Sequence, residues 1–381
     1  VRVNSKDVVG SPATITVNPA AATTANVILS SSTLSATNTS SSGVTATLAL
    51  QDAYQNSITS GSFTAEVRIR NVSSVGPFTA NSFTGSNVVI SDIYYSVVGA
   101  YTLDYYVNNT KLAVTSSLTV LFGDADPSQF TLTGSSSFSV NGDSNYYIVQ
   151  TRDQFGNQRT SQSGPFSVIF NHTSIGAAIN VTCRVDAACV YQSQGAYRAS
   201  FSPLVDGTWE VSVQGGASPT NFTVNPGPVS SQSQLQVTDT VVTANATGTF
   251  TITSKDSEGN IRDHVNTDGS AFIVNVDHEL SSGFATLVST SSGVNGVYTY
   301  TWRASFSGCA GPYLIIATLT DGTPIANAST RSVTVNPAAT AAIDDLTGEG
   351  LGGVGDSIAT SFTFKAYDSF DNLQDAAVVD T

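Results

Sequence analysis

Two of the three cysteines are spaced so that they could form a covalent cross-link within one short segment. Cys183 and Cys189 flank five residues, a spacing that could close a β-hairpin with a disulfide. Such a bond would indicate an oxidising compartment, and the alternative is two reduced thiols in a strand and a turn. Cys309 has no partner nearby in the sequence. It is either a buried free thiol, which we favour, or a cross-link to another chain.

A short acidic turn occurs four times and offers oxygen ligands to a cation. Each copy is an aspartate followed four residues later by an asparagine: Asp52 and Asn56, Asp153 and Asn157, Asp256 and Asn260, Asp368 and Asn372. Calcium takes about six to eight oxygen ligands, whereas one such turn offers one or two side-chain oxygens. We therefore interpret the pair as the cap of a tight turn and predict no metal site.

The other reactive side chains form no recognisable zinc-binding or catalytic pattern. His172, His264 and His278 lie in three separate contexts, without the paired spacing of a zinc site. Serine is abundant, but no Gly-x-Ser-x-Gly sequence occurs at a strand-to-helix turn, where a serine hydrolase of that class would carry it. The sequence predicts no catalytic residue, no cofactor and no cofactor-binding residue.

Asn-x-Ser/Thr sequences, the acceptor sites for N-linked glycans, are frequent in the chain. They occur at Asn38, Asn71, Asn108, Asn171, Asn180, Asn221, Asn245 and Asn327. Their number is close to what the asparagine, serine and threonine content produces by chance, so the frequency alone does not argue for glycosylation. All eight are candidate glycosylation sites, consistent with a secreted protein.

The charge balance and the hydropathy pattern exclude two kinds of partner. The 381 residues include 14 Lys and Arg against 28 Asp and Glu, which gives a formal net charge of −14. Nucleic-acid binding requires a clustered basic surface, so no nucleic-acid partner is expected. No apolar stretch approaches the roughly 20 residues of a membrane-spanning helix, so we expect no membrane insertion within this segment.

The elements that must position these residues are β-strands. Apolar and polar residues alternate over many short segments, for example over 197–201, and turn residues separate the segments at intervals of roughly ten positions. No segment shows a convincing helical period. The pattern therefore predicts an all-β fold.

Three sequence markers recur at a common period and reveal an internal repeat. The first is the Asp-to-Asn turn described above. The second is a glycine two residues before an aromatic residue: Gly99 and Tyr101, Gly207 and Trp209, Gly311 and Tyr313. The third is a closing strand that ends in Val-Asn-Pro, at 17–19, 224–226 and 335–337, with 118–120 in the corresponding place of the remaining repeat. Each marker returns after a little more than 100 residues.

The markers divide the chain into three complete units and two partial ones. Residues 1–22 are expected to be the C-terminal strand of a preceding repeat, and residues 339–381 the N-terminal part of a further one. The complete repeats are predicted over 23–123, 124–227 and 228–338. Units of about 100 residues with about seven strands fit the two-sheet sandwich of immunoglobulin-like domains.

The alternation of side chains also separates core residues from surface residues. The strand before each marker aspartate has apolar residues on one face, and these are Leu48 and Leu50, Tyr147 and Val149, Phe250 and Ile252, Phe362 and Phe364. Because neighbouring strand residues face opposite ways, Tyr106, Tyr146 and Ile148 should point outward. Exposed rings suggest a contact patch for a domain, chain or glycan, and the alternative is that a neighbouring loop or a sugar covers them.

In these features the chain resembles filamin-type repeats, which are immunoglobulin-like sandwiches in tandem. The Asp-x-x-Gly-Asn turns at 153–157 and 256–260, the paired Gly-x-aromatic strands and the Gly-Ser-Pro ending at 10–12 carry the resemblance. Bacterial invasin-like arrays share the turn and are a rival. The resemblance implies that partner strands bind along an edge formed by strands C and D, here about 166–171 and 179–183. Filamins crosslink actin in the cytoplasm, but no actin-binding region is visible.

Short proline-containing links should hold the repeats in an extended rod. We therefore expect a non-catalytic structural protein of an extracellular or cell-surface assembly, such as a filament, appendage or stalk. Its partners would be proteins, chiefly other copies or other subunits of the same assembly, and it would carry N-linked glycans where the acceptor sites are used. The alternative is an adhesion or recognition receptor ectodomain that binds a protein or glycan partner through one repeat.

Overall fold

The structure is a computed structural model of the chain. It describes residues 2–3, 6–7, 17–142, 145–216, 218–263, 268–278, 285–290, 295–305, 309–327, 331–348 and 362–374. His264 lies outside these ranges. Below, residues 23–123, 124–227 and 228–338 are called repeats 1, 2 and 3, and residues 339–381 the fourth segment. The boundaries of these units remain those predicted from the sequence.

Repeat 1 folds into two sheets. Its strands are β3 (Thr24–Leu29), β4 (Thr33–Ser35), β5 (Val44–Gln51), β6 (Ala65–Ile69), β7 (Phe78–Ala80), β8 (Phe83–Thr84), β9 (Asn87–Ile93), β10 (Gly99–Val107) and β11 (Thr110–Leu121). One sheet has the order β3-β5-β9-β8 and the other the order β4-β11-β10-β6-β7. The two sheets enclose a core that includes Leu48, Val67 and Tyr105.

Repeat 2 has the same two-sheet plan. Its strands are β12 (Thr131–Gly134), β13 (Ser137–Ser139), β14 (Tyr146–Gln150), β15 (Phe166–His172), β16 (Ala178–Cys183), β17 (Cys189–Ser193), β18 (Ala196–Ser200), β19 (Gly207–Val213) and β20 (Thr220–Asn225). The sheets have the orders β12-β14-β18-β17 and β13-β20-β19-β15-β16. The expected strands near 166–171 and 179–183 are β15 and β16, which pair antiparallel, and β16 is the edge strand.

Repeat 3 repeats the plan, and a hairpin-like pair follows it. Its strands are β21 (Gln234–Val237), β22 (Val241–Thr243), β23 (Thr247–Thr253), β24 (Phe272–His278), β25 (Ala285–Thr290), β26 (Val297–Ala304), β27 (Gly311–Leu319) and β28 (Arg331–Asn336). The sheets have the orders β21-β23-β26-β25 and β22-β28-β27-β24. In the fourth segment β29 (Thr340–Gly348) pairs with β30 (Phe362–Asp368), and at the N-terminal end β1 (Arg2–Val3) pairs with β2 (Lys6–Asp7).

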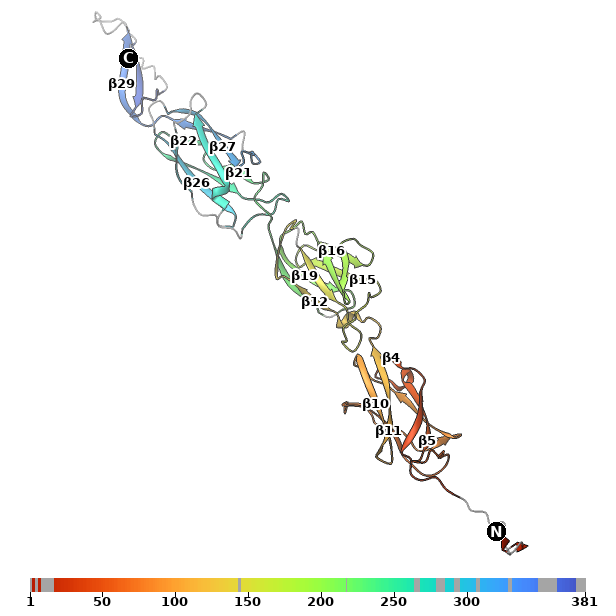
Figure 1. Cartoon of the computed structure of the whole chain (residues 1–381). Coiled ribbons are helices and arrows are strands. Elements are labelled where there is room, and N and C mark those ends of the chain that lie inside the picture. Colours follow the sequence, from red (N-terminus) through yellow and green to blue (C-terminus); the bar gives the residue numbers. More distant parts are fainter. Residues whose placement is uncertain are drawn as a thin grey trace, which may run out of the picture.

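One parallel pairing in each repeat explains why the repeats extend end to end. The second strand runs parallel to the last strand, with Leu34 opposite Val120, Phe138 opposite Val224 and Val242 opposite Val335. Because the second and the last strand run in the same direction, the chain crosses each domain from one end toward the other and leaves it at the far end. Figure 1 shows the result, an elongated row of sandwiches.

The strand alternation predicted from the sequence is confirmed in the cores. The predicted inward residues of the three complete repeats are each at most 3 % exposed: Leu48, Leu50, Tyr147, Val149, Phe250 and Ile252. Phe364 is half-buried in β30, and the side chain of Phe362 lies outside the description. The largest buried side chains are aromatic, among them Trp209 and Trp302. The fold is therefore a tandem array of immunoglobulin-like β-sandwiches.

Helix is confined to short 3₁₀ turns in the described part of the chain. These are η1 (Ser40–Ser42), η2 (Pro127–Gln129) and η3 (Asp268–Ala271). None of these turns has the length or the apolar character needed to cross a bilayer.

Candidate functional site: the joint between repeats

Each marker aspartate closes its own turn with both carboxylate oxygens. Asp153 is fully buried, and its Oδ1 accepts the backbone N–H groups of Phe155 at 3.0 Å and Asn157 at 2.9 Å. The Asn157 amide donates to Oδ2 at 2.9 Å. The turns of Asp52, Asp256 and Asp368 have the same bonds. The carboxylate therefore caps the turn, as the sequence predicted.

The same carboxylates also hold the linker that enters each repeat. In every copy Oδ2 accepts a backbone N–H from the residue three places after the closing valine. The donors are Ala20 to Asp52 at 3.1 Å, Gly123 to Asp153 at 2.9 Å, Gly227 to Asp256 at 2.9 Å and Ala338 to Asp368 at 2.6 Å. The closing-strand marker and the turn marker thus meet in space.

The asparagine of each complete joint reaches back to the preceding repeat. We call the junctions 1–2, 2–3 and 3–4 joint 1, joint 2 and joint 3. In joint 1 the Asn157 amide donates to Ser96 O at 2.7 Å, and Val98 N–H donates to Asn157 Oδ1 at 3.3 Å. In joint 2 the Asn260 amide donates to Leu204 O at 3.0 Å. In joint 3 Ala310 N–H donates to Asn372 Oδ1 at 2.5 Å.

The loop that receives the asparagine is held by the third marker, the Gly-x-aromatic sequence. Each aromatic residue donates to the carbonyl four residues earlier: Tyr101 to Val97 at 3.1 Å, Trp209 to Val205 at 3.1 Å and Tyr313 to Cys309 at 2.8 Å. A Cβ on Gly207 would lie 2.8 Å from His172 Nε2, and its φ of +115° also disfavours other residues. All three markers of the repeat therefore converge at the joints.

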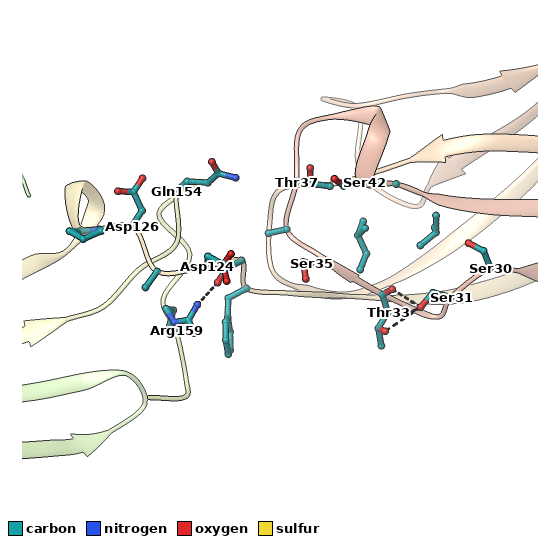
Figure 2. Close-up of a pocket in the computed structure, with 18 residues that line it drawn as sticks. Ser30, Ser31, Thr33, Ser35, Thr37, Ser42, Asp124, Asp126, Gln154 and Arg159 are labelled. Atoms are coloured by element: carbon teal, nitrogen blue, oxygen red, sulfur yellow. Dashed lines mark hydrogen bonds between the residues drawn. The ribbon is translucent and has the colours of Figure 1, made fainter. Parts of the chain in front are cut away.

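A groove lies at joint 1 (Figure 2). It has a volume of about 930 Å³, and loop 30–37, linker 122–127 and the side chains of Gln154 and Arg159 line it. The Arg159 guanidinium donates to Gly123 O and lies 4.7 Å from the centre of the Phe122 ring. Ser and Thr make up six of its 18 lining residues, close to their share of the whole chain, so the lining does not specify a ligand class.

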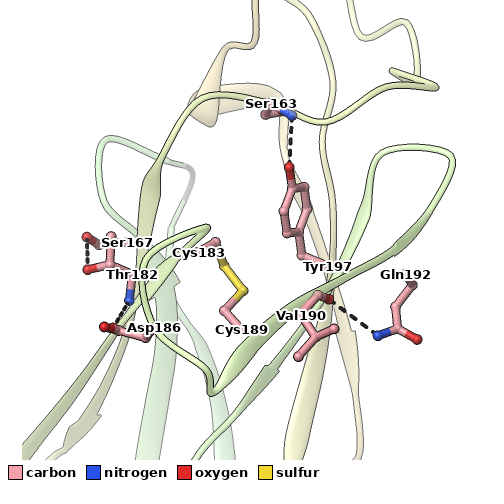
Figure 3. Close-up of a disulfide and its surroundings, with 9 residues drawn as sticks. All are labelled: Ser163, Ser167, Thr182, Cys183, Asp186, Cys189, Val190, Gln192 and Tyr197. Carbon is pink, nitrogen blue, oxygen red and sulfur yellow. Dashed lines mark hydrogen bonds between the residues drawn. A yellow bond between two sulfur atoms is a disulfide. The ribbon is translucent and has the colours of Figure 1, made fainter.

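The structure joins Cys183 and Cys189 in a disulfide (Figure 3). The two Cα atoms are 4.8 Å apart and both side chains are buried. The expected β-hairpin was wrong: β16 and β17 belong to different sheets, so the bond links the two sheets of repeat 2. Cys309 is a buried free thiol, and its sulfur accepts the Asn372 amide at 3.5 Å across joint 3.

The predicted outward residues lie half-buried on the sheet surfaces. The Arg68 guanidinium lies 4.3 Å from the centre of the Tyr106 ring, and Arg198 lies 4.2 Å from that of Tyr146. Ile148 stands opposite Arg198 in the strand pairing. An arginine of the same repeat thus covers each ring, a cover that the sequence reasoning did not consider. The contact patch stays a prediction.

The glycan acceptor residues lie at the surface to different degrees. Seven are exposed: Asn38, Asn71, Asn108, Asn180, Asn221, Asn245 and Asn327. Asn171 is half-buried, and its amide donates to Glu210 at 3.4 Å. Their occupancy stays a prediction.

Hydrogen-bond donors and neighbouring cations lower the pKa of several aspartates, among them Asp52 and Asp104. The Asn56 amide is the main cause of the lowered pKa of Asp52, which is about 2, while backbone donors add to it and burial opposes it. In repeat 1 the Arg70 guanidinium lowers the pKa of Asp104 against the effect of burial, with Lys111 contributing. The residues described contain no group of three or more His, Cys, Asp or Glu side chains arranged to hold a metal ion.

Comparison with known proteins finds solved structures of low overall similarity. No family model and no curated protein matches the chain. The adhesin FdeC of Escherichia coli is 16 % identical over 84 % of this chain and all of that one, with a TM-score of 0.42. Invasin, a bacterial integrin-binding protein, is 13 % identical over 84 % of this chain and 62 % of that one, with a TM-score of 0.41. InvD of Yersinia pseudotuberculosis is 15 % identical over 95 % of this chain and 97 % of that one, with a TM-score of 0.35.

These values are too low to transfer a function. The class that the chain's own fold and joints define is a tandem immunoglobulin-like array. Its membership of the filamin-type family is not confirmed.

Proposed function

We propose that the chain is a non-catalytic structural part of an extracellular or cell-surface assembly, in which the repeats form a stiff spacer or stalk. The observation that carries this proposal is the recurrence of one joint. At joints 1, 2 and 3 an aspartate holds the linker, and an asparagine bonds to the preceding repeat. Hydrogen bonds that tie the linker and a loop of one repeat to the next repeat restrict bending between neighbours.

The surface location is supported by the composition and by the disulfide. Only 11 % of the residues are charged, and the sequence is rich in serine and threonine. A disulfide between the sheets of repeat 2 fits an oxidising compartment. Partners would be other copies or other subunits, binding along strand edges or at the sheet surfaces.

Small-angle scattering on the full chain tests the rod. We expect the cross-section of a single sandwich and a length of at least three sandwiches in a row, as in Figure 1. A compact particle would contradict the proposal. Labelling intact cells with an antibody against repeat 2 tests the location, and labelling only after permeabilisation would contradict it.

An adhesion or recognition receptor is the second candidate, and the groove at joint 1 is the observation that favours it. Two repeats tied by hydrogen bonds form its walls, so the groove is preformed for a protein or glycan partner. A receptor should be monomeric and bind a distinct partner, whereas a structural subunit should associate with its own copies. Sedimentation of the purified chain, with and without candidate partners, separates the two.

A further inference from the structure

One position of the turn differs between the joints and decides what the repeats bury against each other. It is the residue two places after the marker aspartate. In joint 1 this residue is Phe155, whose half-buried ring packs against the hydrophobic core of repeat 1. In joint 3 it is Phe370, which packs in the same way against the core of repeat 3. Each ring belongs to one repeat and completes the core of its neighbour.

Joint 2 has a charged residue at this position. Glu258 is exposed, and its Oε1 accepts the amide of Asn141 from repeat 2 at 2.8 Å. This contact is a polar bond at the surface, where water competes for both partners. In repeat 1 the position is occupied by Tyr54, which is 81 % exposed.

The two kinds of contact differ in the free energy they contribute. Burying an aromatic ring against a neighbouring core contributes in proportion to the apolar area removed from water. An exposed polar or charged pair contributes little, because solvation offsets the interaction. In a repeat array, such interface terms determine how strongly the folding of one repeat depends on its neighbour. Joints 1 and 3 should therefore couple their repeats more strongly than joint 2.

We propose that the rod consists of energetically coupled pairs, with joint 2 as the boundary between them. Repeats 1 and 2 form one pair, and repeat 3 with the fourth segment forms the next. Pro226 and Pro228 restrict the linker backbone at joint 2. Joint 2 is therefore not a flexible hinge: it is the place where the stability of one repeat depends least on its neighbour. This inference goes beyond the proposed function, since a rod of either kind would serve as a stalk.

Native-state hydrogen exchange of the full chain, read by mass spectrometry, tests the inference because it reports the opening of each repeat separately. Phe155→Ala should raise the exchange rates of the slowest amides in β5 and β10 of repeat 1 by about five- to tenfold, as expected for losing a half-buried ring. Phe370→Ala should do the same in β26 and β27 of repeat 3. The matched variant Glu258→Ala should change the rates in β18 and β19 of repeat 2 by less than about threefold.

Phe155→Leu is the control, because leucine keeps an apolar contact and should retain most of the protection of repeat 1. It also decides the outcome if Phe155→Ala fails to fold. Unchanged exchange of repeat 1 in Phe155→Ala would overturn the inference. Loss of protection of the repeat 1 amides in a folded Phe155→Leu variant would also overturn it. So would a five- to tenfold rise in the exchange rates of repeat 2 in Glu258→Ala. The scattering test of the rod is independent of these results.

Discussion

Joint 1 and joint 2 share one set of hydrogen bonds between repeats and differ in the side chain that makes a further contact. In both, a buried aspartate binds the incoming linker at 2.9 Å, and an asparagine donates to a loop carbonyl of the preceding repeat. Joint 1 adds the ring of Phe155, whereas joint 2 adds the surface bond from Asn141 to Glu258. The difference teaches that the shared hydrogen bonds fix the geometry of a joint, while a single variable side chain sets how much each repeat stabilises its neighbour.

The linkers differ in a compensating way. Joint 2 places Gly227 between two prolines, and this glycine is buried. Joint 1 has Phe122 and Asp124 on the two sides of Gly123 in place of the two prolines, and there the Arg159 guanidinium holds the Gly123 carbonyl. Backbone restriction at joint 2 and side-chain contacts at joint 1 thus limit motion by different physical means.

The largest expected effect comes from weakening the core of repeat 2, which borders both joints. Phe170 is fully buried and stacks on Phe201 with ring centres 4.2 Å apart, so Phe170→Ala should cost repeat 2 about 3–5 kcal/mol. Urea unfolding followed by Trp209 fluorescence, in a Trp302→Phe background, measures this loss. In the reciprocal Trp209→Phe background Trp302 is the probe, and Phe170→Ala should shift the urea unfolding of repeat 3 much less. Equal shifts of the two probes would mean that joint 2 couples strongly.

Removing the shared carboxylate should affect both joints alike. Asp153 and Asp256 each accept two turn N–H groups, one asparagine amide and one linker N–H. Asp153→Ala and Asp256→Ala should each cost about 1–3 kcal/mol, because several partly buried donors lose their acceptor. Chemical denaturation of the two variants provides the comparison. Costs that differ by several kcal/mol would show that the shared hydrogen bonds are not equivalent in the two joints.

Acid should weaken the turn of repeat 1 in a defined pH range. The pKa of Asp52 is lowered from 3.8 to about 2 in the folded protein, so its stabilising contribution is complete above about pH 4. That contribution is lost as the pH falls through about 2. Hydrogen exchange or near-ultraviolet circular dichroism of repeat 1 between pH 5 and pH 2 measures it. The Asp52→Asn variant should lose this part of the pH dependence, and an unchanged slope would contradict the assignment.

The smallest effect is expected away from the joints. Arg198→Ala removes the guanidinium 4.2 Å from the Tyr146 ring and should cost about 0.5–1 kcal/mol. Tyr146 should then react faster with a nitrating reagent, while the exchange rates of repeats 1 and 3 stay unchanged. Arg68→Ala, beside Tyr106, is the matched variant in repeat 1. An effect on a neighbouring repeat would show that sheet surfaces also take part in coupling.

Much of the fold followed from spacing in the sequence, because it depends on contacts between neighbouring positions. Alternation placed Tyr147 and Val149 in the core, and the five-residue gap between Cys183 and Cys189 suggested the bond that the structure contains. The asparagine turn was also a local feature, closed over four residues. The arginine over Tyr146 was missed, since it comes from a partner strand about 50 residues later.

The sequence by itself determined the strands, the inward faces and the capped turns, because each depends on residues only a few positions apart. It also determined the period of the repeat, because these local markers recur at a constant spacing along the chain. The sequence contained the three markers of the joint but did not show that they lie close together in space. Only the tertiary structure decided that Asn157 meets a carbonyl 61 residues earlier and that Phe155 completes the core of another repeat. The physical reason is that such contacts exist only when two sandwiches stand end to end, and no periodicity within one sandwich encodes that placement.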